Sequence, residues 1–183
     1  NMGSKVAEPL RIVVFQGGGD SYRHTELCVS ALKLCKQNFD ASIVLGSANI
    51  TFDQNTEIPS GWKLLRQGDF DYPSLLQKAD VAIINGGTTR YECVFSMTPF
   101  IAISIHNYQY NLTQKLVNDG FGFNVGIGSE LSIERLSEIL DIILSDQNNI
   151  IKMKDISRKI LPVSGVANII NTIEEEFVSE NLA

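Results

Sequence analysis

The chain is poor in cysteine, and its three cysteines, Cys28, Cys35 and Cys93, include no C-x-x-C pair. An odd number at these spacings argues against a disulfide framework and against a thiolate zinc site. The sequence also lacks an apolar run long enough to cross a bilayer, and no signal peptide is visible. These absences predict a cytoplasmic protein, either free or held peripherally at the inner face of a membrane.

Basic residues are scarce as well. Lysine and arginine number 15 against 21 acidic residues, and the resulting net charge of -6 argues against a broad nucleic-acid surface. Neither of the two histidines is paired with a carboxylate at metal-ligand spacing. The G-x-S-x-G elbow and the Walker A loop are also missing. We therefore expect no metal and no cofactor, and no motif by itself assigns a catalytic residue.

What is present is an ordinary globular composition. The chain is 44% hydrophobic over 183 residues, which is enough for one sizeable core. We expect a single domain over residues 10–178. A tag or flexible tail is expected at residues 1–9 and another tail at residues 179–183.

Apolar runs with strand character alternate with segments of helical periodicity. Strands are predicted at residues 10–15, 42–45, 62–65, 81–84, 100–105 and 121–125. Helices are predicted at residues 23–38, 73–78, 90–96, 109–119, 132–145, 150–160 and 166–178. Such alternation forms parallel βαβ units. The predicted fold class is therefore α/β, a Rossmann-like, three-layer, doubly wound parallel sheet of about six strands.

Two glycine-rich loops follow the first and fourth predicted strands. Gly17, Gly18 and Gly19 follow the first strand, and Gly86 and Gly87 follow the fourth. In the doubly wound order 3-2-1-4-5-6 these strands are neighbours, and ligands bind beyond their carboxyl ends. Glycines that lead into a helix let the backbone approach an anion. The two loops therefore predict one crevice for a phosphorylated ligand, with the diphosphate between them.

The first loop matches neither the dinucleotide fingerprint G-x-G-x-x-G nor a P-loop. Its glycines are expected to contact phosphate, and the alternative is a tight structural turn. Asp20 and Ser21 are candidates for capping the next helix. Arg23 and His24 lie in the first turn of that helix, where a positive charge opposes the dipole and favours an anionic partner.

The second loop has a sharper pattern that admits two interpretations. In the functional one, Gly86–Thr89 contact phosphate and Glu92 accepts hydrogen bonds from two ribose hydroxyls. In the structural one, Thr89-x-x-Glu92 is a capping box.

A third polar segment, from His106 to Asn111, follows the fifth strand on the same rim. Its amides suit recognition of sugar hydroxyls because an amide both donates and accepts hydrogen bonds. The alternative is that Asn107 caps the next helix. His24 and His106 are the candidates for a catalytic base, and the alternative for both is an exposed loop histidine.

Together these segments resemble the C-terminal, donor-binding half of the GT-B glycosyltransferases. The similarity is to the peptidoglycan N-acetylglucosaminyltransferase, the nucleotide-sugar hydrolase of pseudaminic acid synthesis and spore-coat polysaccharide proteins. It rests on residues 14–20, 77–92, 98–103 and 116–120 and on Gln109, and it extends from about Leu10 to Ile173.

The resemblance implies roles for individual residues. The diphosphate contacts fall on Gly18, Gly19, Asp20, Gly87, Thr88 and Thr89. Glu92 holds the ribose, and Gln109 reads the donor sugar beside His106 and Asn111. The glycosyltransferase pattern has an asparagine three residues after the glutamine, whereas this chain has Leu112 there and Asn111 one position early.

The expected function is to bind a nucleoside diphosphate sugar, a UDP-sugar, as the donor half of a glycosyltransferase in bacterial cell-surface polysaccharide synthesis. An N-terminal acceptor domain or a partner protein is expected to supply the catalytic base, because nothing before Leu10 could form that domain. The isolated chain is therefore expected to be catalytically incomplete. The alternatives are a nucleotide-sugar hydrolase of the pseudaminic acid type and a non-catalytic binding module fused to another enzyme.

Overall fold

The computed structural model describes residues 9–50, 52–53, 55–160 and 168–175. Within these residues six parallel strands form one sheet in the order β3-β2-β1-β4-β5-β6, which confirms the predicted topology. The strands are β1 (Leu10–Phe15), β2 (Phe39–Leu45), β3 (Lys63–Arg66), β4 (Val81–Asn85), β5 (Phe100–Ser104) and β6 (Gly122–Ile127).

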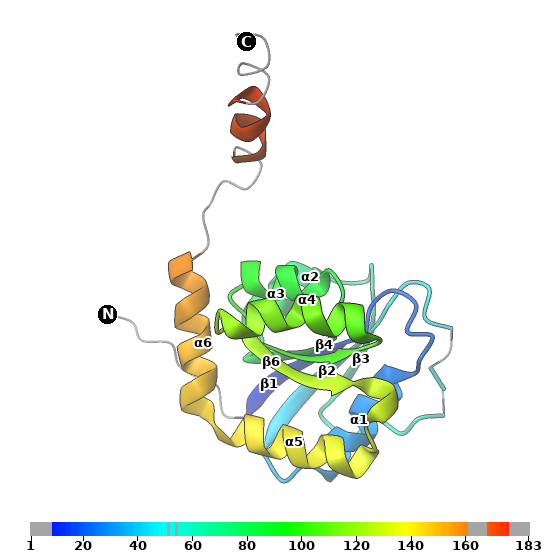
Figure 1. The fold of residues 1–183 in the computed structure, drawn as a ribbon. Helices are drawn as coiled ribbons and strands as arrows, with labels where there is room; N and C mark the ends of the chain where they lie inside the picture. Colours follow the sequence, from blue (N-terminus) through cyan, green and yellow to red (C-terminus); the bar gives the residue numbers. More distant parts are fainter. Residues whose placement is uncertain (1–8, 51, 54, 161–167, 176–183) are drawn as a thin grey trace.

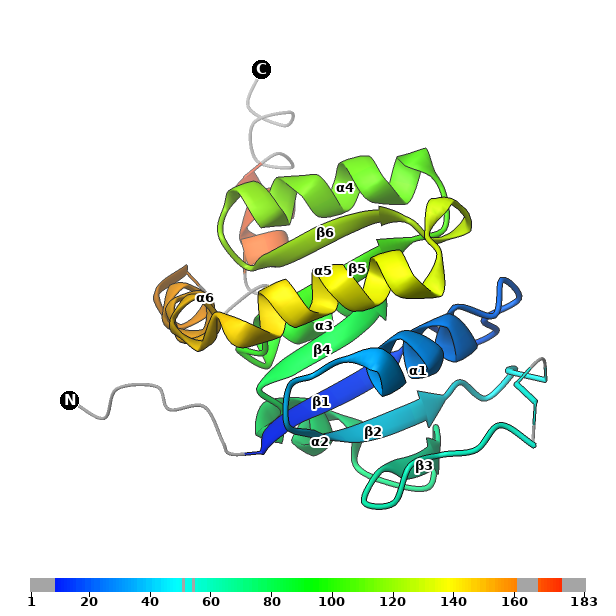
Figure 2. The same ribbon diagram turned by 90° about the horizontal axis from the view of Figure 1, so that it is seen from below.

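Helices cover both faces of the sheet (Figure 1 and Figure 2). On one face lie α1 (His24–Leu34) and α5 (Ile133–Ser145). On the other lie α2 (Tyr72–Lys78), α3 (Thr89–Phe95) and α4 (Asn107–Asn118). A 3-10 turn, η1 (Gly128–Glu130), follows β6, and α6 (Gln147–Ile160) stands beside the layers. The predicted three-layer arrangement is therefore confirmed.

The two central strands show why the chain folds this way. All five residues of β4 and all five of β5 are buried. Along β4, Val81 and Ile83 pack into the core under α1 and α5, whereas Ala82 and Ile84 pack under α2 and α3. A strand that is apolar on both faces needs cover on both sides, and helical crossovers between parallel strands provide it.

Several element boundaries differ from the prediction. The first helix ends at Leu34, four residues early, because Cys35 takes an extended backbone and donates its N–H to the Leu32 carbonyl. The chain then starts β2 at Phe39, where it pairs with Leu10. The sixth helix starts at Gln147 rather than at residue 150. Gly120, with a φ of 87°, follows the C-cap Asp119 of α4 as a C′ glycine.

Other predictions fall partly outside the described residues. The helix predicted at residues 166–178 is described only over residues 168–175, and these residues are helical. Apart from Pro9, the two predicted tails lie outside the described residues.

A buried carboxylate joins three elements at the amino end of the sheet. Asp80 precedes β4 and is fully buried. Its oxygens accept hydrogen bonds from the Arg11 backbone N at 3.0 Å, from Arg11 Nε at 3.1 Å and from Lys154 Nζ of α6 at 2.9 Å. Burial alone would raise the pKa of Asp80, but the hydrogen bonds from Arg11 and Lys154 outweigh it and lower that pKa.

We expect stability to depend on pH through Asp80. Because the pKa of Asp80 is lower in the folded than in the unfolded protein, its carboxylate contributes its full stabilisation at pH values above the unfolded-state pKa of about 3.9. That stabilisation is lost as the pH falls through the pKa of the folded protein. Asp80→Asn should lower the free energy of unfolding by about 1–3 kcal/mol at neutral pH. The difference from wild type should shrink below a pH of about 4.

Urea denaturation across this pH range measures both effects. Asp155→Asn on α6 is the control, because Asp155 forms a surface ion pair with Arg158, and such pairs contribute about 0–1 kcal/mol. A difference between Asp80→Asn and wild type that stays constant with pH would contradict the ionic role.

Candidate functional site

A cavity of about 290 Å3 opens at the carboxyl edge of the sheet, where β1 and β4 are neighbours. It is lined by Phe15, Gly17, Gly18, Gln67, Asn85, Gly87, Thr88, Thr89 and Glu92. The structure therefore brings parts of both predicted loops together at one site. Phe15, Gln67 and Asn85 belong to the cavity although sequence reasoning gave them no role in it.

Asn85 connects the two glycine loops. Its side-chain Nδ2 donates to the Gln16 carbonyl at 2.9 Å, and its Oδ1 accepts from the Gly87 N–H at 3.0 Å. Gly17 has a φ of 90°, and a Cβ at that position would lie 2.6 Å from Asn85 Nδ2. Glycine is therefore required at position 17 both for its backbone conformation and for this close contact. The bonds of one amide set the distance between the two loops.

The loop that follows β2 supports the first glycine loop from the other side. Ala48 donates its backbone N–H to the Gly18 carbonyl at 3.0 Å. A Cβ on Gly46 would lie 2.3 Å from that same carbonyl oxygen and 2.4 Å from the Gly18 Cα. Sequence reasoning missed this role of Gly46. The available signal was a glycine directly after a strand whose carboxyl end lies at the same edge.

Asp20 caps α1 and is not among the residues that line the cavity. It is buried, and its two carboxylate oxygens accept from the backbone N–H groups of His24 and Thr25, each at 2.9 Å. Its predicted role as a helix cap is confirmed. The carboxylate accepts from the first N–H groups of α1, where an anion would otherwise bind, so we leave Asp20 out of the proposed diphosphate contacts that the resemblance implied. Gly19, also outside the cavity lining, is exposed beside it.

The capping-box interpretation of the second loop is wrong. The helix α3 begins at Thr89, so Thr88 is the N-cap residue, and its side chain makes no capping hydrogen bond. Glu92 is exposed and lines the cavity. In the part of the chain that the structure describes, its carboxylate has no hydrogen bond and no ion pair. No structural role in the described chain accounts for this carboxylate.

Gly86 differs from Gly87, the other glycine of its loop. It is buried, and a Cβ there would lie within 3 Å of Ser104 Oγ, Gln109 Cβ and Thr113 Oγ1. The residue therefore packs the loop against β5 and α4. It is not among the residues that line the cavity.

The third polar segment begins α4. His106 is the N-cap, and its Nδ1 accepts from the Gln109 backbone N–H at 3.4 Å, so the alternative cap Asn107 is wrong. The Gln109 Oε1 accepts from the Ile105 N–H at 2.9 Å, which orients the side chain and leaves its NH2 group available. Asn111 is exposed and lies two residues further along the helix. Two residues correspond to a rotation of about 200°, so Gln109 and Asn111 leave α4 on nearly opposite sides.

His24 is not an exposed loop histidine. Its side chain is only 4% exposed, and its ring packs against Gly128, where a Cβ would lie 2.2 Å from Nε2. Burial lowers the pKa of His24, and the nearby charge of Asp20 offsets part of this effect. His24 is therefore a neutral packing residue at neutral pH. His106, by contrast, is exposed at the carboxyl rim.

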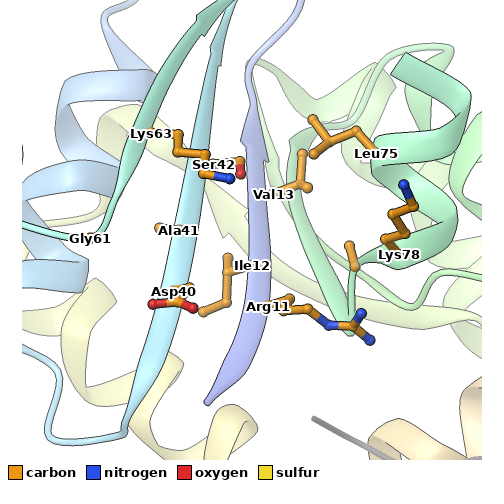
Figure 3. Close-up of a pocket in the computed structure, with 11 residues that line it drawn as sticks. Arg11, Ile12, Val13, Asp40, Ala41, Ser42, Gly61, Lys63, Leu75 and Lys78 are labelled. Atoms are coloured by element: carbon orange, nitrogen blue, oxygen red, sulfur yellow. The ribbon is translucent and has the colours of Figure 1, made fainter. Parts of the chain in front are cut away.

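A second cavity, of about 210 Å3, lies at the opposite edge (Figure 3). Its lining includes Arg11, Asp40 and Lys63, which stand near the beginnings of β1, β2 and β3. It contains none of the predicted site residues, and parallel sheets of this kind bind ligands at the carboxyl edge. We therefore assign the candidate site to the cavity between the glycine loops.

Two further observations concern the described residues only. None of their helices is long and apolar enough to span a membrane. They contain no group of three or more histidine, cysteine, aspartate or glutamate side chains arranged to hold a metal ion.

Comparison with known proteins bears on the fold. No protein-family model and no curated protein matches the chain. MurG of Acinetobacter baumannii superposes with a TM-score of 0.75 at 15% identity, over 93% of this chain and 51% of that protein. The spinosyn rhamnosyltransferase SpnG, complexed with thymidine diphosphate, gives a TM-score of 0.71 at 16% identity, over 94% of this chain and 47% of that protein.

The chain has the fold of half a GT-B glycosyltransferase. The glycosyltransferase SnogD from Streptomyces nogalater shares it, with a TM-score of 0.58 at 19% identity over 94% of this chain and 46% of that protein. The chain spans about half the length of these relatives. The fold expected from the resemblance is thus confirmed.

We predict that Asn85→Asp weakens the structure of the site. A carboxylate has the size of the amide but cannot donate to the Gln16 carbonyl, so the free energy of unfolding should fall by about 1–3 kcal/mol at neutral pH. Protonation at acidic pH restores a donor, so the loss should become smaller there. Urea denaturation at both pH values measures this, with Asn111→Asp on the surface of α4 as the control. Equal stability of Asn85→Asp and wild type at neutral pH would contradict the bridging role.

We also predict that Gly46→Ala costs about 3 kcal/mol of unfolding free energy, at the upper end for overpacking, because the added methyl group meets backbone atoms. Gly19→Ala is the matched control, since nothing lies within 4 Å of a Cβ there. That variant should change stability by no more than about 0.5 kcal/mol. Similar losses in both variants would show that Gly46 does not support the first loop.

Proposed function

We propose that the chain binds a nucleoside diphosphate sugar, with uridine as the base, as the donor-binding half of a glycosyltransferase. The observation that carries this proposal is the cavity between the two glycine loops, with the unpaired carboxylate of Glu92 on its wall. The glycosyltransferase fold of the structural neighbours supports the same class of ligand. The structural neighbour SpnG is complexed with thymidine diphosphate, so a ligand panel that compares the bases tests the choice of uridine.

The proposal places each part of the ligand. The diphosphate lies between Gly17 and Gly18 on one side and Gly87–Thr89 on the other, where glycine allows the backbone to approach closely. The ribose hydroxyls donate to Glu92, since a carboxylate can accept two hydrogen bonds at once. The available NH2 group of Gln109 donates to the sugar, with His106 on the same rim. Asn111, on the far side of α4, is not part of this arrangement.

The chain would hold and polarise the donor. Backbone N–H groups would stabilise the diphosphate as it leaves with increasing negative charge. The base that activates an acceptor hydroxyl would come from a second domain or a partner protein, and closure against that domain would exclude water from the reaction. The half-length coverage of the neighbours supports this division. We propose that this reaction belongs to bacterial cell-surface polysaccharide synthesis, as the sequence resemblance implies.

Hydrolysis of the nucleotide sugar is the second candidate. The observation that favours it is Leu112, which stands where the glycosyltransferase pattern has an asparagine, together with the divergence of Gln109 and Asn111 on α4. With fewer groups to hold a particular sugar, a site of this kind suits attack by water as well as by a hydroxyl.

We predict that Glu92→Gln separates binding from folding. Loss of charge-assisted hydrogen bonds to the ribose should reduce the affinity for uridine diphosphate by about ten- to a hundredfold, equivalent to about 1.5–3 kcal/mol. The unfolding free energy should change by no more than about 0.5 kcal/mol, because Glu92 forms no cap. Isothermal titration calorimetry and urea denaturation on the same variant measure the two quantities.

Glu138→Gln on the exposed surface of α5 is the matched control and should change neither quantity by more than about 0.5 kcal/mol. Titration of the wild-type chain with uridine, cytidine and thymidine diphosphates identifies the base. Absence of binding to all three would refute the proposed function. Unchanged affinity in Glu92→Gln would refute only the ribose contact.

A further inference from the structure

Arg90 carries a buried positive charge directly beneath the second glycine loop. Its side chain is only 5% exposed. In the part of the chain that the structure describes, no carboxylate lies within ion-pairing distance of it. A buried charge is costly unless it is compensated. Arg90 therefore needs an explanation that the general packing of α3 does not supply.

The guanidinium of Arg90 is held by carbonyl oxygens and by one aromatic ring. Its Nη1 donates to the carbonyls of Gly86, at 2.5 Å, and Gly87, at 2.7 Å. Its Nη2 donates to the Tyr91 hydroxyl at 3.1 Å, and its central carbon lies 4.4 Å from the centroid of the Tyr91 ring. Arg90 therefore fixes two successive peptide groups of the loop.

The direction of these carbonyls determines what the loop presents to the cavity. In a planar trans peptide the C=O and the following N–H point in opposite directions. Because Arg90 draws the Gly86 carbonyl toward itself, the Gly87 N–H points the other way, to Asn85 Oδ1. By the same geometry the Thr88 N–H points away from Arg90. Within the described chain it has no acceptor, and Thr88 lines the cavity.

We infer that Arg90 is a positioning residue for the phosphate groups of the ligand. It keeps the Gly86 and Gly87 carbonyls, which would repel an anion, away from the cavity and turns the Thr88 N–H toward it. Its charge, which has no ionic partner within the described residues, adds attraction for an anionic ligand. This inference rests on the proposed binding of a nucleoside diphosphate, although the ordering of the loop by Arg90 is testable without any ligand.

Arg90→Met tests the ordering of the loop first, in the ligand-free protein. Methionine has a similar length and no donors, so the loop carbonyls lose their partners. Hydrogen exchange of a peptide that covers residues 85–92 should become about tenfold faster or more. Peptides from α5 serve as the internal control and should keep their exchange rates. Unchanged exchange of residues 85–92 would overturn the inference, whatever the ligand proves to be.

Binding to uridine diphosphate and to uridine then separates a phosphate effect from a general one. Arg90→Met should weaken uridine diphosphate by about ten- to a hundredfold and uridine by less than about threefold. Arg90→Lys keeps the charge but not the planar fork, so it should recover only part of the affinity for the diphosphate. Full affinity of Arg90→Lys for uridine diphosphate would show that the positive charge alone attracts the phosphates, which would contradict the positioning role. Equal losses for both ligands would overturn the positioning role.

Tyr91→Leu provides a variant that folding is expected to tolerate, because Tyr91 is 53% exposed. It removes the hydroxyl acceptor and the ring that support Arg90. Tyr91 lines a groove between α2 and α3 and is not among the residues that line the candidate site. Selective loss of affinity for uridine diphosphate would support action through Arg90, and unchanged affinity would contradict it. Absence of diphosphate binding by the wild type would refute the proposed function, while the exchange result would still decide the role of Arg90 in the loop.

Discussion

The candidate site depends on one side chain, the amide of Asn85. It donates to the last residue before one glycine loop and accepts from a glycine of the other, so the two loops form a single wall. An amide can do both without carrying a charge. The glycines beside it follow from the same constraint, because Gly17 and Gly87 lie so close to Asn85 that a Cβ would overlap it. The adjacency of β1 and β4 makes the contact possible.

Two buried charged side chains, one at each end of the sheet, differ in their partners. At the amino end, Asp80 is paired with Arg11 and Lys154 and ties β1, β4 and α6 together. At the carboxyl end, Arg90 contacts carbonyl oxygens and Tyr91, and within the described residues it has no ionic partner. A fully paired charge contributes to the stability of the fold. A charge without a counterion is suited to an anion that comes from outside.

The geometry of the candidate site supports ligand binding more clearly than catalysis. His24 is packed against Gly128, and Asp20 is occupied as a helix cap. Of the two candidates for a base, His106 alone remains exposed, at the start of α4. A catalytic base within reach of an acceptor is therefore proposed to come from another domain. The glycosyltransferase relatives, about twice as long, have room for one.

The sequence by itself determined the fold class, the strand order and the position of the two loops. The apolar runs that form β1 and β4 are each followed by glycine and then by a helical pattern. These local signals survive in the fold because parallel strands such as β4 are buried on both faces. Only the tertiary structure decided which residues of the loops face the cavity. Asp20 and Glu92 are both acidic residues near helix starts, yet one caps α1 and the other lines the cavity. That choice depends on where α1 and α3 begin, on the contact between Gly46 and Gly18, and on the bonds of Asn85 and Arg90. Some of these contacts join residues that are distant in the sequence, and the others depend on the direction of the loop carbonyls and N–H groups. No local sequence pattern reveals either kind.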